Sequence, residues 1–192
     1  GAAIIGLIDP PGYIEGGEIW LEDQRMLLLP AESFYGMRSE LVAQFGLDTA
    51  RGVINRMGYG AGCRDAAFAK RLRGSASAFE AFAVGPQLHA LKGMAEIRLQ
   101  QFRMDVSTGQ IDSEFVFHDS FEVERAVGEA LLAQQGACWM LAGYASGYAS
   151  VFMGKEILVR EVECRACGDR QCRAVARPVE DWPDADRDRY LN

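Results

Sequence analysis

The sequence predicts a single α+β domain, with an N-terminal β-hairpin, helices packed on a small antiparallel sheet, and a C-terminal module held together by cysteines. Three observations support this fold class. The 192 residues have the size of one ordinary domain. Apolar positions follow strand spacing in some segments and helical spacing in others. Three of the five cysteines lie within the short segment from Cys164 to Cys172.

The composition excludes several classes of protein. Hydrophobic residues make up 49% and charged residues 24%, as in ordinary globular proteins. No apolar run approaches the roughly 20 residues that span a bilayer, and no signal peptide is visible, so we expect a cytoplasmic protein without membrane contact. The net charge is −7, and the Lys and Arg residues are scattered. Direct binding to nucleic acid is therefore not expected, because it needs a concentrated cationic face.

The first third of the chain predicts a hairpin followed by helices. Residues 18–29 contain two apolar runs around a polar stretch, which is typical of a β-hairpin. Helical spacing follows from Ser33 to about Leu72, where Gly46 and Asp48 separate two helices and Asp48 is the expected N-cap. The glycines of 58–62 lack the context of a phosphate loop, so we expect them to allow close helix packing.

The middle of the chain predicts a short helix and two strands. Pro86 opens the helix at a position where its missing N–H costs nothing, and His89 falls in the first turns. Residues 96–106 and 111–117 alternate as strands joined by a turn, with His118 on the opposite face from the phenylalanines. One face of the second strand carries Ile111, Ser113, Phe115 and Phe117.

The last third predicts one buried helix and two further strands. Asp119 and Glu122 resemble a capping box, which predicts a helix that carries Val123, Val127 and Leu131. Residues 139–152 are apolar with small side chains and predict a buried helix. Strands are expected over 155–162 and 172–176, on either side of the cysteine loop. The polar residues after Pro178 indicate the start of a linker.

The cysteine loop predicts a zinc site. Cys164, Cys167 and Cys172 are close in sequence, and Gly168 supplies a tight turn, so their thiolates can surround one Zn²⁺ ion. A fourth ligand must come from a distant segment, and Cys138 is the obvious candidate. Such a site, with four protein ligands, has no open position, so the metal is expected to be structural.

Spacing alone favours an all-cysteine site, but Glu161 competes with Cys167 for one position. A carboxylate is also a zinc ligand, and Glu161 lies three residues before Cys164. On a regular strand these two side chains would face opposite ways, so the chain must bend near Val162 if both bind the metal.

Several of these segments together resemble a known family. Residues 161–172, with the preceding Gly143–Ser150 and Phe152–Gly154, resemble the 4-vinyl-reductase-like zinc-binding module. With residues 19–26, 85–93 and 119–123 added, the chain resembles the N-terminal sensor domains of sigma-54-dependent activators of aromatic catabolism, which include phenol, dimethylphenol and xylene/toluene regulators. The resemblance extends from about Gly17 to Trp182.

The resemblance implies which residues form the sites. The implied zinc ligands are Cys138, Glu161, Cys164 and Cys172, which leaves Cys167 free. The histidine that bonds a phenolic hydroxyl in this family matches His89. Further candidates for the pocket wall, by position near the matched motifs, are Phe82, Phe115, Tyr144, Tyr148 and Val159.

Phe117 departs from the pattern of the phenol sensors, which carry Trp at the second position that contacts the hydroxyl. A phenylalanine cannot donate a hydrogen bond, whereas an indole N–H can. We therefore predict a preference for bulkier or less polar aromatics, such as alkylbenzenes or substituted phenols.

The resemblance also implies a function. Residues 17–178 would form a sensor domain for a small aromatic effector, with a zinc module at about 137–178, an arm at 1–16, and at 179–192 the start of a linker to an ATPase domain and then a helix-turn-helix domain. A homodimer is expected. One alternative is a module that binds a lipid or tetrapyrrole and shares the zinc knuckle. An enzyme that uses Cys63 or His89 is less favoured, because no nucleotide-binding fingerprint is present and a base and an orienting partner are lacking.

Overall fold

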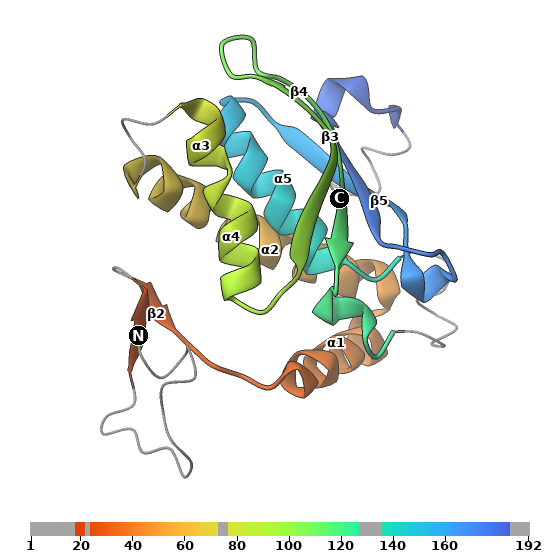
Figure 1. The fold of residues 1–192 in the computed structure, drawn as a ribbon. Helices are drawn as coiled ribbons and strands as arrows, with labels where there is room; N and C mark the ends of the chain where they lie inside the picture. The colour runs from red at the N-terminus through yellow and green to blue at the C-terminus, as the bar shows by residue number, and fades with distance from the viewer. Residues whose placement is uncertain (1–17, 22–23, 73–76, 127–135, 185–192) are drawn as a thin grey trace. The chain divides into compact units, whose positions relative to one another are not determined.

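The computed structural model describes residues 18–21, 24–72, 77–126 and 136–184 (Figure 1). The chain divides into two compact units, residues 1–34 and 35–192. In the first unit, β1 (Ile19–Leu21) and β2 (Gln24–Met26) pair antiparallel. The predicted hairpin is therefore confirmed, but its strands are shorter than expected: Leu27, Leu28 and Leu29 follow β2 and are exposed.

Two helices follow the hairpin, as predicted. They are α1 (Ala31–Phe45) and α2 (Leu47–Leu72), and Gly46 separates them with a left-handed φ of 80°. The expected N-cap at Asp48 is wrong, because α2 already begins at Leu47. Asp48 lies in the first turn instead, where its carboxylate is 3.0 Å from the guanidinium of Arg51. No described helix is both long enough and apolar enough to cross a membrane.

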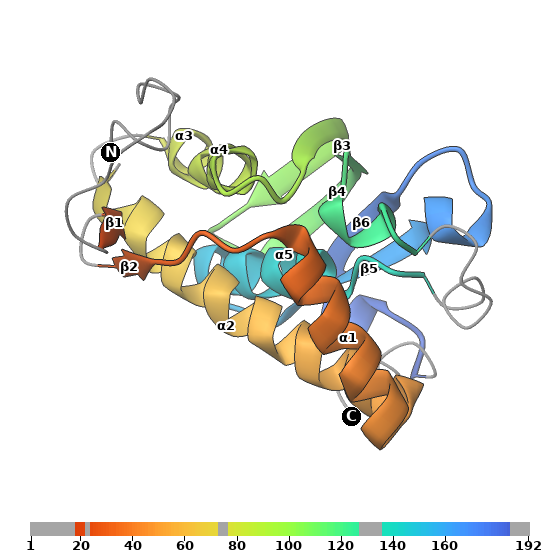
Figure 2. The ribbon, with the colours of Figure 1, turned by 90° about the horizontal axis from the view of Figure 1, so that it is seen from below.

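The second unit is built on an antiparallel sheet in the order β3-β4-β6-β5. The strands are β3 (Glu96–Asp105), β4 (Gln110–His118), β5 (Ile157–Glu163) and β6 (Arg173–Pro178). Helix α5 (Trp139–Met153) lies between this sheet and α2 (Figure 2). Two short helices, α3 (Ala78–Phe82) and α4 (Val84–Leu91), precede β3, and α4 packs against it. All strands predicted here, and the buried helix, are confirmed.

Helices α2 and α5 touch backbone to backbone. Gly58 and Gly62 of α2 face α5, while Gly143 and Gly147 of α5 face α2. A Cβ atom added at any of these glycines would overlap a carbonyl oxygen of the opposite helix. The prediction that the glycines of 58–62 serve close helix packing is therefore confirmed.

The predicted capping box at Asp119 and Glu122 is wrong. Residues Phe121–Val123 form a 3-10 turn, and Asp119 has a φ of 50°, outside the helical region. The fully buried carboxylate of Glu122 accepts hydrogen bonds of 2.9 Å from the backbone N–H groups of Met140 and Leu141. It therefore caps the N-terminus of α5, a helix that starts 17 residues later in the chain. The predicted helical positions 127 and 131 lie outside the described residues.

The C-terminal segment packs further than the sequence suggests. After β6 the chain forms a 3-10 turn over Val179–Asp181, and Trp182 is buried against Leu158 and Val175. The Trp182 indole donates a hydrogen bond of 3.1 Å to the Leu158 carbonyl. Residues 179–182 are thus part of the packed unit, although a linker had been expected to start at residue 179.

Candidate ligand pocket and metal cluster

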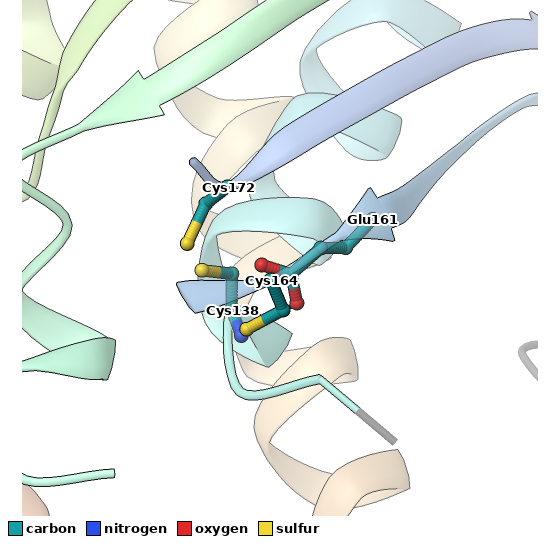
Figure 3. Close-up of side chains that lie close together, drawn as sticks. All are labelled: Cys138, Glu161, Cys164 and Cys172. Atoms are coloured by element: carbon teal, nitrogen blue, oxygen red, sulfur yellow. The ribbon is translucent and has the colours of Figure 1, made fainter. Parts of the chain in front are cut away.

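Four side chains from three segments meet near the N-terminus of α5 (Figure 3). Cys138 immediately precedes α5, Glu161 lies on β5, Cys164 follows β5, and Cys172 precedes β6. Their potential ligand atoms all lie within 4.8 Å of one another, and the three cysteines are buried. The structure thus brings together the four residues that the resemblance implied as zinc ligands.

A bulge in β5 makes this meeting possible. The pairing of β5 with β6 shifts register between Glu161 and Glu163, which is the bend near Val162 that the sequence required. Cys167 lies outside the cluster: it is exposed, and its sulfur accepts a hydrogen bond of 3.3 Å from the Gly136 N–H. The all-cysteine set that spacing favoured is therefore not the set that the structure assembles.

The electrostatics of the cluster suit a cation. Hydrogen bonds from the Cys138 and Cys164 thiols lower the pKa of Cys172 to about 5. Burial raises the pKa of Glu161 to about 8, with a further contribution from Cys164. One carboxylate oxygen of Glu161 accepts from the N–H groups of Ala137 and Cys138 at 3.1 Å, while the other is buried without a partner in the described chain. A buried, unpartnered oxygen beside three thiols is a donor set that fits Zn²⁺.

A second site is a cavity of about 60 Å³ between α3, α4, the sheet and α5. All seven residues that the sequence analysis named as pocket candidates line this cavity: Phe82, His89, Phe115, Phe117, Tyr144, Tyr148 and Val159. Their positions follow from simple periodicities. Phe115 and Phe117 alternate on the inner face of β4, as predicted, and Tyr144 and Tyr148 are one helical turn apart on α5.

Phe102 also lines the cavity and was missed by sequence reasoning. Ile97 and Leu99 alternate on β3 and line the cavity, but the register shifts between Leu99 and Gln101. This bulge adds one residue, so Phe102 faces inward where strict alternation would place residue 101. The ring of Phe102 then contacts that of Phe82, with a centroid separation of 5.4 Å.

The tyrosines offer rings rather than hydroxyls to the cavity. The Tyr144 hydroxyl donates to a carboxylate oxygen of Asp65 at 2.6 Å. The Tyr148 hydroxyl lies 3.0 Å from the Phe82 carbonyl oxygen and 3.3 Å from that of Ala81. Burial raises the pKa of both phenols, so they remain protonated donors to these partners.

His89 is the polar residue of the lining with unused hydrogen-bonding capacity. It is 2% exposed, and its ring meets the Tyr144 ring edge-on at a centroid distance of 4.1 Å. Its Nδ1 is buried with no hydrogen-bond partner among the described residues. Burial, aided by the charge of Lys92, lowers the pKa of His89 to about 3, so the imidazole is neutral at pH 7. A neutral imidazole can accept one hydrogen bond and donate another.

Comparisons with known proteins agree with this architecture. Residues 13–105 match the family model "Activator of aromatic catabolism", and residues 117–178 match the model of the vinyl-4-reductase domain. The chain is 40% identical over 168 residues to the transcriptional regulatory protein XylR of Pseudomonas putida, and 37% identical over 170 residues to the phenol regulator MopR of Acinetobacter guillouiae. Each match covers 88% of this chain but 30% of the relative, so the chain spans under a third of their length.

Two solved structures share the fold. One is trafficking protein particle complex subunit 3 from Naegleria fowleri, covalently bound to palmitic acid, with a TM-score of 0.58 and 13% identity over 77% of this chain and 92% of that one. The other is the phenol-responsive sensory domain of the transcription activator PoxR with phenol, with a TM-score of 0.84 and 40% identity over 90% of this chain and 86% of that one. At that identity and coverage, the chain belongs to the family of sensory domains found in activators of aromatic catabolism.

Proposed function

We propose that this chain is the effector-sensing part of a bacterial transcriptional activator and that its cavity binds a small aromatic molecule. The observation that carries the proposal is the cavity itself, which is lined by aromatic and aliphatic side chains around one unpartnered histidine. Burial of an apolar ring supplies affinity at about 25 cal/mol per Å². In the whole protein, occupancy would relieve repression of a downstream ATPase domain, while a separate domain would contact DNA. We also propose a homodimer.

His89 and Phe117 together set the polarity of the proposed effector. His89 would hydrogen-bond a hydroxyl, because leaving its buried nitrogen unpaired costs about 1–3 kcal/mol. Phe117 is 1% exposed and offers no donor, whereas the phenol sensors carry Trp at the matching position. The proposed effectors are therefore alkylbenzenes and substituted phenols, with phenol itself bound less well.

The size of the cavity bears on the class of ligand. Its volume of about 60 Å³ is well below the roughly 150 Å³ of an engineered cavity that takes up benzene. An aromatic ring would thus enter only if side chains such as Phe82 and Phe102 move outward. A tetrapyrrole or a long acyl chain would need a far larger rearrangement, which disfavours the alternative of a lipid- or tetrapyrrole-binding module.

Zn²⁺ is proposed as a structural cofactor held by Cys138, Glu161, Cys164 and Cys172. When bound, it would crosslink the start of α5 to β5 and β6, and its four protein ligands would leave no position for a substrate. The buried oxygen of Glu161 that has no partner in the described chain supports this assignment.

We propose no catalytic role for the domain. Cys63 is a poor nucleophile here, because burial raises the pKa of its thiol, and its sulfur lies 3.5 Å from the Gly147 carbonyl oxygen. His118 is the second of the two histidines in the chain, and its Nδ1 lies 3.0 Å from a carboxylate oxygen of Asp119 on the half-exposed end of β4. Neither residue has the arrangement of a nucleophile and its base.

Calorimetric titration of the zinc-loaded protein tests the proposed function. The panel is phenol, a dimethylphenol, a hydroxybiphenyl and toluene. At least one should bind in the micromolar range, which corresponds to about −8 kcal/mol. No detectable binding of any of the four compounds would contradict the sensor function.

A further inference from the structure

A buried ion pair lies directly behind the cavity and outside its lining. Asp65 of α2 is 2% exposed, and one of its carboxylate oxygens accepts both the Tyr144 hydroxyl, at 2.6 Å, and the Lys92 ammonium. Lys92 follows the last residue of α4, and Tyr144 lies on α5, so the carboxylate joins three helices. Burying a carboxylate costs several kcal/mol, and apolar residues often serve stability as well. A role beyond stability is therefore worth seeking.

The two groups that Asp65 holds are strong donors beside His89. The Tyr144 ring lies edge-on to the imidazole at 4.1 Å. Lys92 lies three residues after His89 at the end of α4, on the same side of the helix, and its charge acts on the imidazole. The Lys92 ammonium also lies 5.8 Å from the centroid of the Tyr144 ring. Either donor, once released, would find the buried imidazole nearby.

We infer that Asp65 is a positioning residue for effector specificity: it holds the Lys92 ammonium and the Tyr144 hydroxyl away from His89, so that the imidazole stays free for a phenolic hydroxyl. This inference rests on the proposed function. Without the carboxylate, the Lys92 ammonium would be left without its buried partner, and the imidazole would be an acceptor within reach. A hydroxylated effector would then have to displace a charged donor, whereas a hydrocarbon would not use the imidazole at all.

The test compares phenol and toluene binding in Asp65→Asn by calorimetry. Asparagine can still accept from Tyr144 but no longer neutralises Lys92. The preference for phenol over toluene, expressed as the ratio of their Kd values, should fall about tenfold, because an ionised donor bonds more strongly than a neutral hydroxyl. The double variant Asp65→Asn with Lys92→Met removes both charges with an unbranched side chain and should restore the ratio to within about threefold.

A merely structural role for Asp65 predicts a different pattern. Both ligands would then weaken equally in Asp65→Asn, and the added Lys92→Met change would not restore the ratio. Either result overturns the inference. If the wild-type protein binds neither compound, the proposed function fails first, and this is distinguishable from wild-type binding with an unchanged ratio in the variant.

Tyr144→Phe keeps the inference testable even if Asp65→Asn does not fold. It retains the ring and the Asp65–Lys92 pair and removes a hydroxyl that the carboxylate already holds. The ratio of Kd values should therefore stay within about twofold of the wild type. A tenfold loss of phenol preference in Tyr144→Phe would show that this hydroxyl contacts the effector and would overturn the inference.

Discussion

Hydrogen bonds within the protein decide which pocket residues can still use their polar atoms on an effector. Tyr144 and Tyr148 look equivalent to His89 in sequence, since all three combine a ring with a polar atom. In the structure both hydroxyls have protein partners, whereas Nδ1 of His89 has none in the described chain. The discrimination between phenols and hydrocarbons should thus depend on one side chain.

His89→Ala should weaken phenol binding about tenfold and toluene binding no more than about threefold, because only the phenol loses a hydrogen bond. Calorimetry with both compounds measures the difference. His118→Ala is the matched control: it removes the other histidine, whose side chain is 37% exposed, and should change neither affinity. Equal losses for phenol and toluene in His89→Ala would show that the imidazole does not contact the hydroxyl.

At the scale of elements, the α2–α5 pair is the rigid part of the pocket wall. Its glycines allow the helix backbones to touch, and α5 then presents Tyr144 and Tyr148 to the cavity. Gly85 of α4 serves the same wall, because a Cβ there would meet the Tyr148 ring at 2.5 Å. Small residues thus fix where the aromatic rings stand.

Two glycines of α2 provide a matched test of this packing. A Cβ at Gly62 would overlap the Tyr144 carbonyl, whereas one at Gly60 would meet only the end of the flexible Arg64 side chain, at 3.5 Å. Gly62→Ala should therefore destabilise the protein by about 1–3 kcal/mol or more, and Gly60→Ala should stabilise it by about 0.5–1 kcal/mol through helix propensity. Chemical denaturation measures both. Similar effects of the two substitutions would contradict the backbone contact.

The sequence predicted most elements and most of the site, and the failures have local causes. Periodicity identified α2, α5 and the four-stranded sheet, because each buries one regular face. It missed α3, which has five residues and a capping box between Ser77 and Glu80 but too few turns for a periodic pattern. It placed Glu122 in the wrong cap, because a side chain that caps a helix 17 residues later leaves no local spacing.

The pocket lining was predictable only where strands and helices are regular. The alternation of Phe115 and Phe117 survives in β4, and the spacing of the tyrosines survives in α5. The bulge in β3 shifted Phe102 inward, and no residue type in the sequence marks that bulge. Asp65 lay in a helical stretch as an ordinary polar residue, since its two partners come from other helices.

At the scale of the whole second unit, α5 connects the metal cluster to the pocket. Cys138 precedes its first residue, and Tyr144 and Tyr148 line the cavity within about 15 Å along the same helix, at 1.5 Å per residue. Since the glycine contacts hold α5 against α2, the cluster and the Glu122 cap fix the end of a stiff element. Loosening that end should disturb the pocket wall as well as the cluster.

Removal of zinc should therefore lower both stability and effector affinity. Treatment with a strong chelator is expected to reduce Tm by about 10 °C, the shift that a loss of about 4 kcal/mol produces in a domain of this size, and to abolish aromatic binding. Elemental analysis, thermal unfolding and calorimetry on the same samples measure the three quantities. Cys172→Ser should reproduce the effect without chelator, because it removes a buried member of the cluster.

Cys167→Ser is the matched control, since this thiol lies in the same loop but outside the cluster. It should retain the metal, the Tm and the affinity of the wild type, and Cys63→Ser should do the same. Because coordination joins β5, β6 and α5, the losses of Tm and of affinity should follow zinc content together across all these proteins. A metal-free protein with an unchanged Tm and unchanged effector affinity would separate the cluster from the pocket and contradict this coupling.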